Sequence, residues 1–269
     1  MITKSRKRIV PYNVYAPIRD GLRYLRSFRY AGGRYECPLC KGRFSTFRST
    51  GQRATVLADR QVVGAGYRQN AKCPRCRCDD RERLVYLFLT RRAGDLLARG
   101  IRLLHVAPEK RLCTWLRSHP NIDYVSVDLD SPLAQMQMDI TDITFADNSF
   151  ELIICNHVLE HIPDDAQAMR ELFRVLKPGG LAILQVPISY AIDSTYEDFT
   201  IVDSEARLAA FGQRDHVRIY GPDYPQRLGR AGFAVKAHPV TEMFRDDEVD
   251  QFRLLINERL FECRKPEPS

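Results

Sequence analysis

The chain has 269 residues, of which 44% are hydrophobic and 28% are charged. This ordinary globular composition excludes a mostly disordered or fibrous chain, and no apolar run has the length that a membrane span needs. Because no apolar signal core follows the basic first residues, we expect a cytoplasmic protein. Its eight cysteines are then expected to be metal ligands or buried thiols rather than disulfides.

Charge is distributed unevenly along the chain. Residues 1–102 carry 24 Lys and Arg against 7 Asp and Glu, whereas residues 103–269 carry 17 against 27. This asymmetry indicates two parts with different tasks. The basic part suits contact with nucleic acid, an anionic lipid surface, an acidic substrate or the acidic part of its own chain.

Residues 1–34 form a basic lead-in. Within it, Ile18, Leu22, Leu25 and Phe28 recur at helical spacing with arginines between them, which predicts a short basic amphipathic helix. We favour a helix that packs on the rest of the protein and keeps its arginines in water. Membrane or nucleic-acid contact is the alternative.

Residues 35–83 contain two Cys-x-x-Cys pairs, Cys37/Cys40 and Cys73/Cys76. Two such turns place four thiolates at the corners of a tetrahedron, the geometry of closed structural zinc sites. The pattern therefore predicts a zinc ribbon, in which Cys78 is an alternative ligand to Cys76. A helical connector is expected over residues 84–101.

From residue 102 to 269, apolar strands alternate with helices, which predicts an α/β domain with a mainly parallel sheet. The first strand, Arg102–Val106, precedes Glu109, and Asp128 ends the second strand 19 residues after that glutamate. An acid at this position can accept hydrogen bonds from both ribose hydroxyls of a nucleotide-like cofactor.

Three sequence features then follow one another: Asp128 at the end of a strand, the run DNSFELIIC over residues 147–155, and VLEHI followed by RVLKPGG up to Gly180. Together they resemble the type 11 group of class I methyltransferases that use S-adenosylmethionine. The whole chain also resembles bacterial methyltransferases that carry a zinc ribbon before this domain. The resemblance implies a Rossmann-like seven-stranded sheet ending in an antiparallel hairpin, with residues 233–240 and Arg259–Arg264 as its last two strands.

The resemblance also implies a cofactor site. Asp128 would hold the ribose of S-adenosylmethionine, and Asp139 and Ile140 would flank its adenine. Leu129, next to Asp128, would also contact the cofactor. The methionine part would be lined by Ala107, Pro108, Glu109, Asn156 and His157. This chain departs from the family in lacking a glycine-rich first loop, and only ten residues separate Asp128 from Asp139, so the usual second helix should be short or absent.

Candidate acceptor-side residues lie further along the chain. His216 and His157 are the candidate catalytic bases, with His216 expected in a polar surface-lining loop at an ordinary pKa of about 6.5. Arg218 and Tyr196 are the candidate acceptor contacts. The run His157-Val-Leu-Glu-His161 also fits a zinc-peptidase pattern, but it directly follows a strand rather than lying in a long helix, so we set peptidase chemistry aside.

The expected function is methylation of a hydroxyl or similar group on a small metabolite or sugar. An RNA methyltransferase that grips phosphates through the basic zinc ribbon is the alternative. The third interpretation is a non-catalytic binding module. The missing glycine-rich loop is compatible with such a module, but the presence of Asp128 and Asp139 argues against it.

Overall fold

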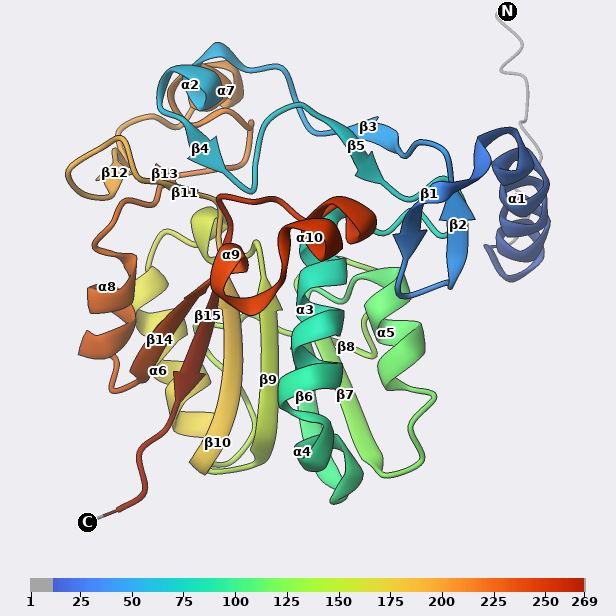
Figure 1. Cartoon of the computed structure of the whole chain (residues 1–269). Helices are drawn as coiled ribbons and strands as arrows, with labels where there is room; N and C mark the ends of the chain where they lie inside the picture. The colour runs from blue at the N-terminus through green and yellow to red at the C-terminus, as the bar shows by residue number, and fades with distance from the viewer. Residues whose placement is uncertain (1–11, 269) are drawn as a thin grey trace, which may run out of the picture.

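The computed structural model describes residues 12–268, with side chains from residue 19 onward. Residues 1–11 of the predicted lead-in, and the side chain of Ile18, lie outside this described part. Within it, no helix is both long and apolar enough to cross a membrane. The chain forms a sheet flanked by helices, with the N-terminal segments above one edge of the sheet (Figure 1).

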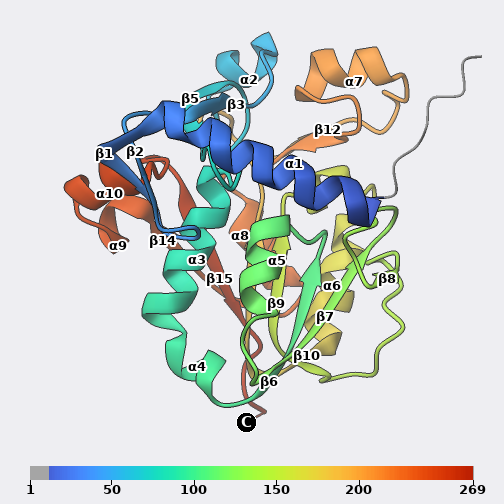
Figure 2. The same cartoon turned by 90° about the vertical axis from the view of Figure 1, so that its right-hand side faces the viewer.

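The predicted N-terminal helix is present as α1 (Tyr12–Ser27), followed by the turn η1 (Phe28–Tyr30). The expectation that its apolar residues pack on the domain is wrong, because Leu22, Leu25 and Phe28 are 48%, 63% and 55% exposed. The helix is held instead by a polar contact, in which Lys110 Nζ donates to Asp20 at 2.6 Å. It therefore runs along the outside of the domain (Figure 2).

Short antiparallel pairs follow α1 and surround a small core of aromatic rings and cysteines. The elements are β1 (Ala31–Cys37), β2 (Gly42–Phe44), β3 (Arg48–Thr50), α2 (Thr55–Asp59), β4 (Val62–Val63) and β5 (Arg68–Lys72). The fully buried Arg83 links this core to the rest of the chain. Its guanidinium donates to the carbonyls of Ala71, Cys78, Phe252 and Arg253.

The main sheet has seven strands in the order β14-β15-β10-β9-β6-β7-β8. Their bounds are β6 (Ile101–Val106), β7 (Ile122–Asp128), β8 (Met136–Gln137), β9 (Phe150–Asn156), β10 (Leu176–Gln185), β14 (Ala234–Pro239) and β15 (Arg259–Arg264). β15 pairs antiparallel with both β10 and β14, so the predicted fold class and final hairpin are confirmed. No helix separates β7 from β8, as the short spacing predicted.

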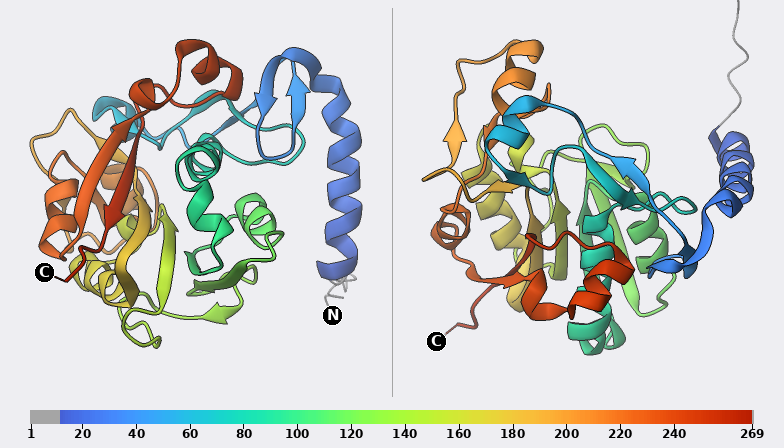
Figure 3. Two further views of the ribbon diagram at one scale, coloured as in Figure 1. Left: turned by 60° about the horizontal axis from the view of Figure 1, so that its bottom comes forward. Right: turned by 45° about the horizontal axis from the view of Figure 1, so that its top comes forward.

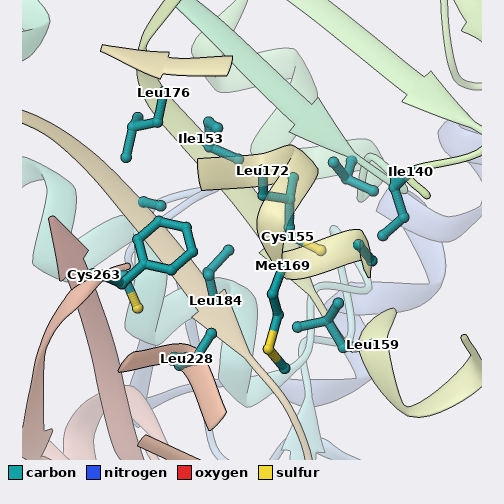
Figure 4. Close-up of a cluster of buried hydrophobic side chains, with 14 of the residues drawn as sticks. Ile140, Ile153, Cys155, Leu159, Met169, Leu172, Leu176, Leu184, Leu228 and Cys263 are labelled. Atoms are coloured by element: carbon teal, nitrogen blue, oxygen red, sulfur yellow. The ribbon is translucent and has the colours of Figure 1, made fainter. Parts of the chain in front are cut away.

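Helices cover both faces of the sheet, and their bounds are α3 (Asp80–Arg92), α4 (Gly94–Ala98), α5 (Lys110–Leu116), α6 (Asp165–Val175), α8 (Tyr224–Arg230), α9 (Val240–Met243) and α10 (Asp246–Phe252). α7 (Ser204–Phe211) lies apart from the sheet, beside α2 (Figure 1). On one face, Met169 and Leu172 of α6 pack against Ile153 and Leu184 of the strands (Figure 4). Each such buried side chain contributes about 1.5–3 kcal/mol. The other face packs on α3, α5, α9 and α10.

The N-terminal part covers the carboxyl edge of the sheet (Figure 3, right). β4 pairs with β11 (Ile188–Ser189), which directly follows β10, and the Ser189 hydroxyl donates to the carbonyl of Arg60. β12 (Tyr196–Glu197) and β13 (Arg218–Ile219) form a further pair above the same edge. The N-terminal segment therefore supplies part of the walls around the site that this edge forms.

Candidate active site

A cavity of about 640 Å³ opens at the carboxyl ends of β6, β7 and β9. This is the point where the strand order reverses, since β6 lies between β7 and β9, and open parallel sheets bind ligands there. We call it the cofactor cavity. Its walls include Ala107, Asp128, Leu129, Asp139, Ile140, Thr141, His157, His161 and Asp215.

Two non-glycine residues with left-handed backbones form the base of the cofactor cavity. Ala107 follows β6 with φ 48°, and His157 follows β9 with φ 54°. Their amides are fixed by the sheet, because Ala107 N–H donates to Val127 and His157 N–H donates to Gln185. Such conformations cost of order 1–3 kcal/mol and concentrate at functional sites. Ala107 thus makes a left-handed turn directly after β6 without a glycine.

Asp128 is held in a fixed orientation at the cavity wall. Its Oδ1 accepts hydrogen bonds from the backbone N–H groups of Asp130 and Ser131, both at 2.8 Å. These bonds order the loop after β7 and leave Oδ2 available to a ligand. Asp139 uses its Oδ1 in the same way, accepting from the amide and hydroxyl of Thr141 at 2.8 Å.

Glu109, Asn156 and Pro108 lie next to the cavity rather than in its wall. The Glu109 carboxylate accepts from Asn156 Nδ2 at 3.2 Å and lies 3.0 Å from His105 Nε2 and 3.5 Å from Arg81 Nε. Burial alone raises the pKa of Glu109, but these partners outweigh it and lower the pKa. Glu109 therefore stays ionised inside a buried network. The participation of His105 and Arg81 was not predicted from sequence.

His216 does not lie in a surface loop, so that expectation is wrong. Its side chain is 2% exposed, and its ring packs edge-on against His161 with centroids 4.6 Å apart. Burial lowers its pKa to about 3, helped by His161 and opposed by Asp215. Burial also lowers the pKa of His157. Both imidazoles are therefore neutral near pH 7.

Arg218 is fully buried, and its guanidinium is used within the protein. It donates to the carbonyls of Leu159, Ile162 and Pro163 and to Glu197 Oε2 at 2.9 Å. The predicted contact between Arg218 and an anionic acceptor is therefore wrong, because these groups occupy its donors. The residue instead fixes the turn after β9 against β13, which is what brings its neighbour His216 inside.

A second cavity, of about 400 Å³, lies beyond the β4–β11 pair, and we call it the acceptor cavity after the role that we propose for it below. Its walls include Val63, Tyr190, Thr241, Asn257, Glu258 and Arg259. Gly64 separates it from the cofactor cavity, since a Cβ built there would lie 3.1 Å from Glu258 Oε2 and 3.4 Å from His157 Cε1. Burial raises the pKa of Glu258 to about 8, with a further contribution from Asp80. Tyr196, a predicted acceptor contact, is half-buried under the guanidinium of Arg60 and lines neither cavity.

Sequence reasoning missed Gly64 and Glu258. The only signal for Gly64 was the glycine-rich turn Val63–Gly66, and Glu258 lies in a linker without a motif.

The predicted zinc ligands come together in one cluster. Cys40 Sγ lies 3.7 Å from Cys73 Sγ, and Cys37 Sγ lies 3.6 Å from Cys76 Sγ. Cys78 joins as a fifth sulfur, 3.4 Å from Cys37 and 3.3 Å from Cys76. The set in which all sulfurs lie within 4.8 Å of one another is Cys37, Cys73, Cys76 and Cys78. The structure thus makes Cys78 compete with Cys40, whereas the sequence suggested competition with Cys76.

The two Cys-x-x-Cys turns have matching backbones. Lys41 N–H donates to Cys37 O at 2.8 Å, and Arg77 N–H donates to Cys73 O at 3.1 Å. Lys41 and Arg77, the residues after each second cysteine, are both left-handed, with φ 54° and 70°. Tetrahedral zinc with Zn–S bonds of about 2.3 Å separates its sulfurs by about 3.8 Å, so the observed spacings fit such an ion.

The strands around the cofactor cavity are similar to known proteins. Residues 94–184 match the family model described as a methyltransferase domain. An uncharacterized methyltransferase of Mycobacterium sp. (strain KMS) is 32% identical over 129 residues, which cover 44% of this chain and 50% of that protein. The methyltransferase GfsG of Streptomyces halstedii is 31% identical over 118 residues, covering 44% of this chain and 37% of that protein. The chain thus spans half or less of the length of these curated relatives.

Among solved structures, a putative sarcosine dimethylglycine methyltransferase from Galdieria sulphuraria superposes with a TM-score of 0.47 at 15% identity, covering 70% of this chain and 86% of that one. The family match falls on β6, β7, β9 and most of β10, the strands around the cofactor cavity. Residues 94–184 are therefore similar to a methyltransferase domain, and they supply most of the walls of the cofactor cavity.

Proposed function

We propose that the chain transfers a methyl group from S-adenosylmethionine to a hydroxyl or similar group of a small metabolite or sugar. The observation that carries this proposal is the cofactor cavity, where Asp128, Asp139 and Ile140 line one space at the switch point of the sheet. Its volume of about 640 Å³ lies in the usual range for ligand pockets.

The residues that line the cofactor cavity fit this cofactor. Asp128 has one carboxylate oxygen committed to the loop and a second available for the ribose hydroxyls. Buried Ile140 and Met138 supply an apolar surface for the adenine. When bound, S-adenosylmethionine supplies an activated methyl on a positively charged sulfur. The residues of this chain would then hold the acceptor in line with that methyl.

A hydroxyl acceptor must lose its proton as its oxygen lone pair forms the new bond to carbon. His157 and His216 are the candidates to accept that proton, and both are neutral because burial lowers the pKa of each. Because burial lowers the pKa of both rings, position distinguishes them: His157 lines the cofactor cavity, whereas His216 does not. Replacing His157 by Ala should slow turnover by roughly 10²–10⁴-fold.

The acceptor cavity supports a small polar acceptor. Tyr190, over which the Arg259 guanidinium packs at 4.8 Å, gives it an aromatic surface, and Asn257, Thr241 and Glu258 give it hydrogen-bonding groups. Aromatic and polar groups together suit a sugar or a hydroxylated metabolite. Glu258 and His157 both lie against Gly64, which places the two cavities next to each other.

We further propose that the cysteine cluster holds one structural zinc through Cys37, Cys40, Cys73 and Cys76. The matching backbones of the two turns support this set over one that includes Cys78. Buried Cys78 would then pack beneath the ion, where Arg83 donates to its carbonyl and approaches its sulfur. A core this small depends on the metal for its stability.

The second candidate function is methylation of RNA. The arginines of α1 and the ribbon, Arg26, Arg29, Arg34, Arg43 and Arg48, are exposed. Tyr24 and Phe28 are 48% and 55% exposed on the same part of the chain. Exposed cations beside exposed rings are the combination that binds single-stranded nucleic acid.

An experiment with labelled cofactor separates the two functions. The protein is incubated with S-adenosylmethionine labelled in its methyl group, once with a small-molecule and glycan extract and once with total RNA. We expect the label in the small-molecule or glycan fraction. Glu258→Gln should reduce it, whereas the Arg26→Gln and Arg29→Gln double variant should not. Label in RNA that depends on those arginines would instead establish the second function.

A further inference from the structure

Three metal-ligating side chains meet beside the cofactor cavity. One ligand atom each from Glu160, His161 and His216 lies within 4.8 Å of the others. Two come from the turn η2 (Leu159–His161) after β9, and the third precedes β13. The segments are held together by the Val217 N–H, which donates to Glu160 O at 3.0 Å.

We propose that Glu160, His161 and His216 bind a divalent transition-metal ion that holds the oxygen of the acceptor near the cofactor. This inference rests on the proposed function, because it requires the reacting oxygen of the acceptor to enter the cofactor cavity beside His161. The proposed ion is separate from the zinc of the cysteine cluster.

The main evidence for the metal site is that two buried polar atoms lack a hydrogen-bond partner among the described residues. Glu160 is 1% exposed and His216 is 2% exposed. Among the described residues, neither Glu160 Oε2 nor His216 Nε2 has a hydrogen-bond partner. Leaving a buried polar atom unpaired costs about 1–3 kcal/mol, which a metal bond would offset. By contrast, His105, His119 and His238 all have hydrogen-bond partners.

The surroundings of the three residues suit metal ligands. Asp215 Oδ2 lies 3.3 Å from His161 Nδ1, and His157 Nδ1 lies 3.5 Å from Glu160 Oε1. An outer carboxylate beside a ligand histidine is the usual support in metal sites, because it orients the ring.

The turn after β9 contains the run His157-Val-Leu-Glu-His161, which fits the zinc-peptidase pattern. η2 is a short 3-10 turn and not a long helix, so His157 and His161 do not form the paired ligands of a peptidase. Glu160 acts here as a candidate ligand, and the third ligand comes from His216, 55 positions after His161. No sequence pattern joins residues so far apart.

Two imidazoles and one carboxylate favour zinc, manganese, iron or cobalt over calcium and magnesium. In a tetrahedral site with metal–ligand bonds of about 2.1 Å, the ligand atoms lie about 3.4 Å apart. The three ligand atoms here lie within 4.8 Å of one another, so small side-chain rotations would bring them to that spacing. Three protein ligands leave an open position. His161 lines the cofactor cavity, so an acceptor hydroxyl could take that position. Metal binding would lower the pKa of this hydroxyl. The hydroxyl proton would pass to water or His157. The oxygen lone pair would then form the bond to the methyl carbon while the carbon–sulfur bond breaks and its electron pair stays on the sulfur of S-adenosylhomocysteine.

The test adds Co²⁺ to the zinc-loaded full-length protein. We expect one cobalt per chain beyond the zinc by elemental analysis, with visible d–d bands and no thiolate charge-transfer bands. Glu160→Gln and His216→Asn should each weaken cobalt binding at least tenfold. His238→Asn is the matched control, because His238 pairs with Glu262 on β15 at the far side of the sheet, and it should bind cobalt normally.

No cobalt beyond the zinc, or equal binding by all variants, would overturn the proposal. If a buried variant fails to fold, half-buried His161→Asn provides the same test. Binding of S-adenosylhomocysteine is measured on each sample. If the unchanged protein binds S-adenosylhomocysteine but no additional cobalt, the metal site alone is refuted. If it binds cobalt but not S-adenosylhomocysteine, the proposed function is refuted.

Discussion

Replacement of Asp128 by Asn isolates the ribose contact. Asn keeps an oxygen that can accept from the amides of Asp130 and Ser131, which Oδ1 now does at 2.8 Å. It removes the negative charge and replaces Oδ2 with an amide group that donates. The loop after β7 should therefore keep its shape, while a ribose hydroxyl loses its acceptor.

The magnitude follows from the bonds lost. A hydrogen bond to a charged group contributes about 1.5–3 kcal/mol, and about 1.4 kcal/mol corresponds to a tenfold change in Kd. Losing one such bond should therefore weaken S-adenosylhomocysteine binding by about 10–100-fold. Isothermal titration calorimetry measures this directly, and the thermal unfolding temperature should stay close to that of the unchanged protein.

Asp130→Asn is the matched control, since the same chemical change occurs two residues away on an exposed side chain outside the cavity wall. It should leave the Kd unchanged. Equal Kd values for Asp128→Asn and the unchanged protein would refute the placement of the ribose. If affinity falls and the unfolding temperature also drops strongly, the substitution has disrupted the loop after β7, and the loss of affinity does not report on the ribose contact.

Further predictions concern the metal cluster and the boundary between the cavities. Cys40→Ser should lose the zinc that elemental analysis detects, whereas Cys78→Ser should retain it; the reverse result would replace Cys40 by Cys78 in the ligand set. Gly64→Ala, at φ +83° and 3.1 Å from Glu258 Oε2, should lower the free energy of unfolding by about 1–2 kcal/mol. Gly94→Ala, which meets nothing within 4 Å, should not, and equal effects would refute the reasoning. Since burial raises the pKa of Glu258 to about 8, its contribution to stability is lost as pH rises from about 4.5 to 8. Glu258→Gln should raise the unfolding temperature at pH 8 but not at pH 4, and a constant difference would contradict this.

The fold was predictable because its signals are local. Buried strands such as Phe150–Asn156 read as apolar runs. The Lys177–Gly180 segment correctly marked the end of the preceding helix, but it forms the first part of β10 and not a connection before that strand. The outer placement of α1 was not predictable. Helical spacing identifies an apolar face but not what covers it, and here the contact depends on Asp20 meeting Lys110, 90 positions away.

The candidate site was predictable only in part, for the same reason. Asp128 and Asp139 lie at strand ends, where topology alone brings them to one edge of the sheet. The burial of His216 depends on Arg218 binding carbonyls after β9, a contact that spans 59 positions to Leu159. The position of Glu258 depends on the close approach of Gly64. Neither contact leaves a pattern in the sequence.

The most direct test of the central claim is an experimental structure of the protein with S-adenosylhomocysteine bound. The account predicts the ribose hydroxyls on Asp128, the adenine between Asp139 and Ile140, and the sulfur facing His157. Ligand density in the acceptor cavity, or elsewhere outside the carboxyl ends of β6, β7 and β9, would contradict it.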